Sequence, residues 1–134
     1  MEQFSIKNLG PISEASVEFG DLTFLVGPQA TGKSLFLETL KLVSDGGHIV
    51  RTLDTYSYAT GRVENILNAY YGDGMSKLWH EGTSATYEGR TYSGTSWLLE
   101  KDHEPSPKES LLYIPAQRIL SISDGRPKNF MEFN

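Results

Sequence analysis

The sequence contains no cysteine, which excludes disulfides and thiolate metal sites. No apolar run approaches the roughly 20 residues that a membrane-spanning helix needs, and residues 1–30 lack the basic-then-apolar pattern of a signal peptide. Basic residues are also few, since 12 Lys and Arg stand against 17 Asp and Glu and give a net charge of -5. This balance does not favour a general nucleic-acid binder, because phosphate contact favours a basic surface. We expect a cytoplasmic protein without membrane association.

Nothing in the sequence indicates more than one domain. The 134 residues suit a single domain, and a hydrophobic content of 38% can supply a core. Internal repeats and low-complexity tracts are absent. His48, His80 and His103 are too far apart for a metal-ligand motif, so surface or structural roles are expected for them. Residues 1–134 are therefore predicted to form one unit.

The first 27 residues have the pattern of three strands. In residues 3–9 and 14–19 apolar and polar residues alternate, as in half-buried strands, and Gly10-Pro11 indicates a turn between them. Residues 22–27 are apolar on both faces, which is typical of a buried central strand.

A helix is predicted from Lys33 to about Ser44. Its apolar side would be formed by Leu35, Phe36, Leu40 and Val43. Glu38 and Lys41 should face water, and Gly46-Gly47 should end the helix.

The rest of the chain alternates short elements with turns. A second helix is predicted at 63–71, stopped by Gly72, and is followed by a turn with a short helical piece. Residues 84–102 have the pattern of a two-stranded hairpin that turns at Glu88-Gly89. After a connector rich in Pro, Ser and charge, residues 111–114 should form a short apolar strand.

The segment from Gly27 to Ser34 matches G-x-x-x-x-G-K-[ST], the P-loop motif, at every fixed position. An apolar segment precedes it and a predicted helix follows. Amides at a helix N-terminus lack intrahelical partners and the helix dipole adds positive charge, so anions bind there. Gly27 and Gly32 permit close backbone approach. Lys33 is expected to reach the β- and γ-phosphates, and the Ser34 hydroxyl to ligate Mg²⁺.

We therefore predict ATP and Mg²⁺ as cofactors of this segment. The predicted contacts are Gly27, Pro28, Gln29, Ala30, Thr31, Gly32, Lys33, Ser34 and Leu35. The alternative reading is a glycine-rich turn with a solvent-facing lysine, which a motif match together with its strand-then-helix context makes less favourable.

Residues 4–43, FSIKNLGPISEASVEFGDLTFLVGPQATGKSLFLETLKLV, resemble the ATP-binding head of the ABC-type superclass, and most closely the SMC/RecF/OLD-like AAA ATPases. The likeness lies in the hairpin with its Gly-Pro-Ile turn and in the P-loop after it. Gln29 stands where these families usually have asparagine. The resemblance implies an α/β fold, the N-terminal lobe of a P-loop NTPase, whose mixed sheet has an antiparallel hairpin before the P-loop strand. It also implies that Lys7 and Asn8 lie near the base or ribose.

LLYIPAQR, residues 111–118, is a second point of likeness. The resemblance implies that Gln117 is the glutamine that contacts Mg²⁺ and the attacking water in such heads. A polar residue that simply ends a strand is the alternative. With this assignment, Lys33 and Gln117 are the predicted catalytic residues, and Ser34 and Gln117 the predicted metal ligands. Arg118 could contact phosphate or a partner, or lie on the surface.

Two parts that hydrolysis requires in this superclass are not evident in the sequence. A Walker B strand ends in Asp and Glu, and a signature segment comes from a second head. SWLLEKD, residues 96–102, offers Glu100 and Asp102, but it is short and precedes Gln117. Residues 1–134 are therefore expected to be one lobe of a longer ATPase, active only when a C-terminal lobe or second head completes it.

The resemblance implies a homodimer of heads that sandwich ATP, coupled to nucleic acid or an effector nuclease in DNA repair or phage defence. Two other functions stay open. One is a stand-alone P-loop kinase or other phosphotransferase, against which the leading hairpin counts. The other is an interaction module that binds a nucleotide without hydrolysing it.

Overall fold

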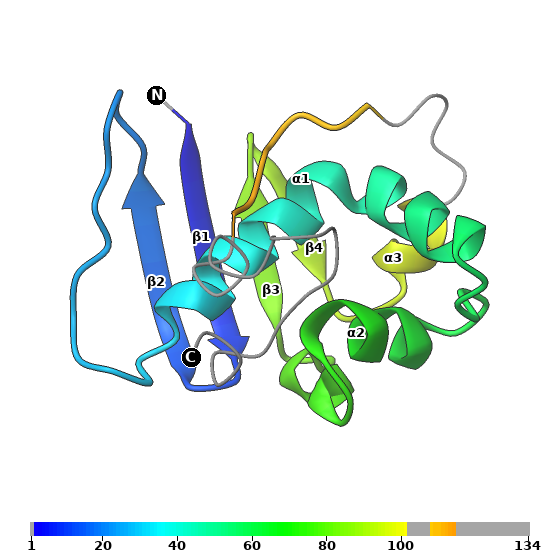
Figure 1. The fold of residues 1–134 in the computed structure, drawn as a ribbon. Helices are drawn as coiled ribbons and strands as arrows, with labels where there is room; N and C mark the ends of the chain where they lie inside the picture. The colour runs from blue at the N-terminus through cyan, green and yellow to red at the C-terminus, as the bar shows by residue number, and fades with distance from the viewer. Residues whose placement is uncertain (1, 102–107, 115–134) are drawn as a thin grey trace, which may run out of the picture.

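The fold is built on one sheet and one long helix. The computed structural model describes residues 2–101 and 108–114. The elements in chain order are β1 Gln3–Leu9, β2 Ile12–Glu18, α1 Lys33–Thr55, α2 Val63–Tyr71, the 3-10 helix η1 Met75–Leu78, β3 Ser84–Tyr87, β4 Arg90–Ser93 and α3 Trp97–Lys101. The strands form a sheet of order β2-β1-β3-β4, and α1 lies across one face of it (Figure 1).

The alternation of side chains along the strands decides which face of the sheet α1 covers. Phe4 and Ile6 of β1 are fully buried, and the register places them beside the apolar partners Ala15, Val17, Ala85 and Tyr87. The opposite face is polar, with Ser5 and Ser16 joined by a hydrogen bond of 3.0 Å. One side of the sheet is therefore core and the other meets water.

Helix α1 packs on the sheet through the apolar side that the sequence predicts. Phe36 meets Phe4 edge to face, with ring centroids 5.0 Å apart. Leu40 and Val43 are buried in the same core, and Leu35 is half-buried. The contact between Phe4 and Phe36 fixes the first turn of the helix against the centre of the sheet.

The predicted end of this helix at Gly46-Gly47 is wrong. The helix continues to Thr55, with a kink at Asp45, whose φ and ψ of −121° and 27° are not helical. Both glycines are buried, and so are Ile49 and Val50 beyond them. Each glycine costs a helix roughly 1 kcal/mol relative to alanine, but the apolar packing of the following turns outweighs that cost.

The predicted exposure of Lys41 is also wrong. Its face of the helix points away from the sheet, as expected, but residues 109–111 cover it and leave Lys41 only 7% exposed. Glu38 on the same face is half-buried. Amphipathic periodicity identifies the side that faces the core, but it carries no information about a distant segment that covers the other side.

Two predicted strands do not form in the described residues. Residues 23–27 run as extended chain without pairing, and Leu22, Phe24 and Val26 are 75% to 88% exposed. Residues 111–114 are likewise extended but unpaired. Within the described residues the α/β fold has an antiparallel sheet and not the predicted mixed sheet, because every strand pair there is antiparallel. An apolar strand pattern needs a partner edge, and neither segment has one here.

The second half of the chain follows the sequence pattern more closely. Helix α2 ends at Gly72, η1 is the short helical piece, and the hairpin of β3 and β4 turns at Glu88-Gly89 with both φ angles positive, at 50° and 72°. The stretch SWLLEKD is not a strand, because Trp97–Lys101 form α3. Trp97 packs 5.3 Å from the Trp79 ring, which draws this segment into the core as a helix.

Glu100 consequently lies on a helix and not at the end of a sheet strand, which rules it out as the Walker B glutamate. Asp102 lies outside the described residues. Within those residues, no helix has the length and apolar character to cross a membrane.

Replacing Phe4 with alanine should destabilise the fold by about 3–5 kcal/mol, because it removes a fully buried ring from the contact with Phe36. Denaturant unfolding followed by circular dichroism measures this difference. Ser5→Ala, one residue along on the polar face, is the matched control and should cost less than about 1.5 kcal/mol. Equal losses for the two variants would contradict the assignment of the faces.

Candidate functional site

The candidate site is the loop of residues 27–34, which leads into the N-terminus of α1. Residues 27–31 are exposed, and so is Ser34. Ala30 and Gly32 both adopt left-handed backbone conformations, with φ of 61° and 94°. The Thr31 hydroxyl between them donates to the carbonyl of Pro28 at 2.9 Å. The structure therefore shows a tight turn that closes directly on the first turn of the helix.

Gly32 is required at this position for two reasons. Its left-handed φ is strained for residues with a side chain. In addition, a Cβ on Gly32 would lie 2.8 Å from Cγ1 of Ile12, which is buried in the hairpin of β1 and β2. The loop is thus seated against the hairpin, and this close approach holds the helix N-terminus beside β2.

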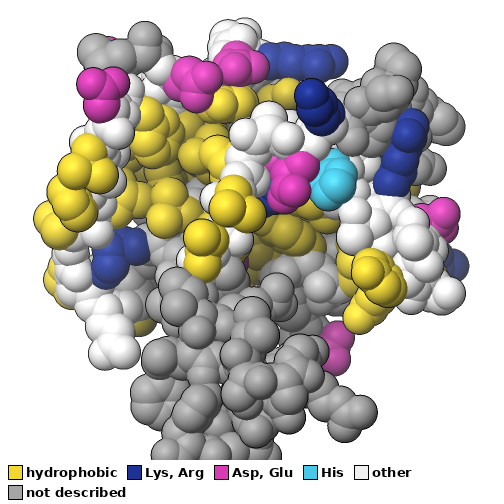
Figure 2. Space-filling view, turned by 45° about the horizontal axis from the view of Figure 1, so that its top comes forward, with side chains coloured by type: hydrophobic (Ala, Val, Ile, Leu, Met, Phe, Trp, Pro, Cys, Tyr) yellow, Lys and Arg dark blue, Asp and Glu magenta, His cyan; other side chains and the backbone are white. Residues whose placement is uncertain are grey.

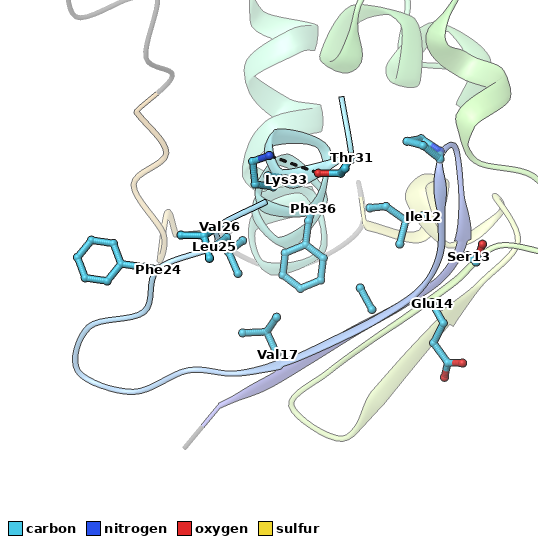
Figure 3. Close-up of a pocket in the computed structure, with 13 residues that line it drawn as sticks. Ile12, Ser13, Glu14, Val17, Phe24, Leu25, Val26, Thr31, Lys33 and Phe36 are labelled. Atoms are coloured by element: carbon cyan, nitrogen blue, oxygen red, sulfur yellow. Dashed lines mark hydrogen bonds between the residues drawn. The ribbon is translucent and has the colours of Figure 1, made fainter. Parts of the chain in front are cut away.

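Lys33 folds back over the loop. Its Nζ donates to the carbonyl of Gly27 at 2.8 Å and to the carbonyl of Pro28. It also donates to the Thr31 hydroxyl at 3.3 Å, the contact drawn in Figure 3. All three ammonium hydrogens therefore have acceptors in the loop. The contact with Thr31 is long, so an incoming anion could take its place while the two carbonyls keep the ammonium at the loop.

The first amides of α1 are available to a ligand. The first helical hydrogen bond runs from Phe36 N to Gly32 O at 2.8 Å, so the amides of Lys33, Ser34 and Leu35 precede the intrahelical ladder. Gly32, as the N-cap, supplies no side-chain hydrogen bond, and the first turn has no acidic residue. The helix dipole and the Lys33 ammonium therefore concentrate positive charge at one exposed point.

A cleft of about 530 Å³ opens beside this point. It lies between β2 and the extended segment 24–26, and it reaches Gly32 and Lys33. Its lining is mainly apolar, and Figure 3 shows Ile12, Val17 and Phe36 facing the cleft, with Glu14 and the Phe24 ring turned away. Binding clefts for small organic ligands have this size and character.

A second cleft, of about 400 Å³, lies on the other side of the same extended segment. It also reaches Lys33, and Ser34 and Asp21 line it. The segment 22–26 therefore forms a wall between two clefts that share Lys33.

The structure brings together most of the residues that the sequence predicts for the site. Residues 27–35 are contiguous around the helix N-terminus. Leu35 is half-buried, and the next residue, Phe36, is buried. Ser34 is exposed, so its hydroxyl is accessible from solvent. Among the described residues, however, there is no group of three His, Cys, Asp or Glu that could hold a metal by itself. Gln117 and Arg118 lie outside the described residues.

The expectation that Lys7 and Asn8 lie near the base or ribose stays a prediction. Lys7 forms an ion pair of 3.5 Å with Glu14, and the Asn8 amide donates to the carbonyl of Gly82 at 3.2 Å. Neither residue lines either cleft. Ile12 and Val17 do line one, and the sequence reasoning did not single them out. The only signal in the sequence was their inward-facing position in the alternation of β2. That pattern does not distinguish a core position from the wall of a cleft.

No protein-family model, curated protein or solved structure matches this chain.

Gly32→Ala should destabilise the fold by about 2–4 kcal/mol, because it adds both a strained backbone and a clash with Ile12. Thermal and denaturant unfolding of the two proteins measure the difference. Gly20→Ala is the control: a Cβ there meets nothing within 4 Å, so a change within about 0.5 kcal/mol is expected. A Gly32→Ala protein as stable as the Gly20→Ala protein would show that the loop is not seated against the hairpin.

Proposed function

We propose that this chain binds ATP with Mg²⁺ through the loop 27–34, as the N-terminal lobe of an SMC/OLD-like ATPase. The observation that carries the proposal is the coincidence of three features at one point. These are the uncapped N-terminus of a long helix, a lysine folded over the loop before it, and an apolar cleft beside both. Phosphate, charge and base each have a matching place in this arrangement.

The triphosphate would lie against the amides of Lys33, Ser34 and Leu35. Its charge suits the helix dipole, and Lys33 would exchange its long contact with Thr31 for a phosphate oxygen. The cleft between β2 and residues 24–26 would take the base, which packs well against an apolar wall such as Ile12 and Val17.

The residues present fit Mg²⁺ in the form in which it accompanies a nucleotide. Mg²⁺ keeps several waters and needs few protein ligands when phosphate oxygens are available. The exposed Ser34 hydroxyl can supply one ligand. The bound ion would neutralise phosphate charge, and it would not require a dedicated cage of carboxylates.

Hydrolysis would depend on a further lobe or a second head. The only carboxylate run that the sequence offered as a Walker B segment, around Glu100, lies on α3.

The exposed apolar residues support the same proposal. Leu22, Phe24, Val26, Leu112 and Ile114 are all largely exposed, and Figure 2 shows hydrophobic side chains gathered around a hollow on one face. A monomeric surface seldom leaves such a patch uncovered.

Lys33→Ala is expected to weaken Mg-ATP binding about tenfold to a hundredfold, because it removes a charge-assisted hydrogen bond to phosphate. Isothermal titration calorimetry measures the affinity. Lys77→Ala, which removes an exposed lysine on η1, is the control of equal charge and should bind as the parent protein does. Unchanged affinity in the Lys33→Ala protein would contradict the proposal, provided that circular dichroism shows that the variant is folded.

The chain alone is expected to bind ATP without appreciable turnover, because the segment around Glu100 that the sequence offered as a Walker B strand is helix α3. A coupled assay for ADP release tests this expectation, with Lys33→Ala as the background. Turnover by the isolated chain that disappears in that variant would favour the phosphotransferase alternative over a half-head.

A further inference from the structure

Residues 108–114 cross α1 as an extended segment, here named the strap (Figure 1). Leu111 and Tyr113 point inward and are half-buried, whereas Leu112 and Ile114 are 77% and 59% exposed. The strap belongs to none of the strand pairs that the structure describes. Leu111 packs against the hydrophobic core, so buried apolar area contributes to the attachment of the strap beside its polar contacts.

A single carboxylate, that of Asp45, accepts three hydrogen bonds from the strap. Oδ1 of Asp45 accepts from the Ser110 amide at 2.9 Å and from the Ser110 hydroxyl at 2.5 Å. Oδ2 accepts from the Leu111 amide at 2.9 Å and from Lys41 Nζ at 2.7 Å. Asp45 is only 3% exposed, so these hydrogen bonds replace water almost completely.

Lys41, on the same helix, also holds the strap, and we name Lys41 and Asp45 together the clasp. Its Nζ donates to Asp45, to Glu109 Oε1 at 2.7 Å and to the carbonyl of Leu111. Burial alone would lower the pKa of Lys41, but the hydrogen bonds to Asp45 and Glu109 outweigh it and raise the pKa. Burial would raise the pKa of Asp45, but the hydrogen bonds from Lys41 and Ser110 lower it. Both groups are thus charged at neutral pH.

The strap covers a polar stripe of α1, and its Leu111 also packs against the apolar core. Glu38, Lys41 and Asp45 lie three and four residues apart, on one side of the helix. The Tyr113 hydroxyl approaches Glu38 Oε1 at 3.5 Å. Phe36, Leu40 and Val43 lie on the side that packs against the sheet. Release of the strap would let water solvate this stripe and would uncover the part of the core that Leu111 contacts.

The two clasp charges share one helix, which keeps the cost of release low. Removing one member of a buried ion pair is expensive because it strands the other charge. Release of the strap does not do this, since Lys41 and Asp45 stay four residues apart and hydrate together. The lost contacts include those with Glu109, Ser110 and Leu111 and the approach of the Tyr113 hydroxyl to Glu38.

From this arrangement we propose that the strap is a releasable conformational element. Asp45 acts as its positioning residue, and the strap leaves α1 while the sheet and the helices stay folded. This proposal does not depend on the identity of the ligand at the loop 27–34.

Hydrogen exchange of the parent chain at neutral pH, read by mass spectrometry, tests the proposal. Amides of the strap should exchange at least about tenfold faster than core amides of β1 and α1, because local opening precedes global unfolding. Asp45→Asn should speed exchange in the strap by a further tenfold or more, since it replaces a carboxylate that accepts four hydrogen bonds.

Ser110→Ala leaves α1 untouched and keeps the test valid if Asp45→Asn does not fold. It removes one of the four hydrogen bonds and should speed strap exchange by about three- to tenfold, with core amides unchanged. Lys108→Ala, which removes an exposed side chain at the start of the strap, is the control, and a change below about threefold is expected.

Two results would overturn the proposal. One is strap exchange as slow as core exchange in the parent chain, which would mean that the strap opens only on global unfolding. The other is a Ser110→Ala protein in which strap exchange is unchanged, or in which the strap and the core accelerate equally.

Discussion

The contact between Phe4 and Phe36 is the constraint on which the rest of this structure depends. It places the first turn of α1 over the centre of the sheet, next to the strand whose alternation is most strictly apolar on one side. Because the helix begins only three residues earlier, the same contact fixes where its N-terminus points. The loop 27–34 is then confined between the helix and the hairpin, where only glycine fits at position 32.

Helix α1 uses its surfaces for different purposes. The apolar side forms the core, the N-terminus carries the exposed amides and Lys33, and the polar stripe holds the strap. Placing these features on one rigid element means that a displacement of the helix would move all of them together. The kink at Asp45 lies where the strap is held, so the helix departs from regular geometry at the residue with the most polar contacts to a distant segment.

The exposed apolar segments are the feature of this structure that is least expected in a domain that functions alone. Leu22, Phe24 and Val26 alternate outward along an extended chain that also forms the wall of two clefts. Extended chain of this kind offers unpaired backbone groups as well as side chains. Under the proposed function, a further lobe would both cover this segment and complete the site beside it, so one addition would satisfy both needs.

The sequence by itself determined the local features of this protein. The alternation in residues 3–9 and 84–93, the helical period from Lys33 and the turn at Glu88-Gly89 are short-range patterns, and the structure follows them. The motif around Lys33 likewise predicts the loop residues, because its glycines and lysine act within one turn of chain. Tertiary structure alone decided the burial of Lys41 and Asp45, the helix that runs through Gly46-Gly47, and the unpaired state of residues 23–27. Each of these features depends on which distant segment packs against the residues concerned. The periodicity within a segment contains no information about that distant segment.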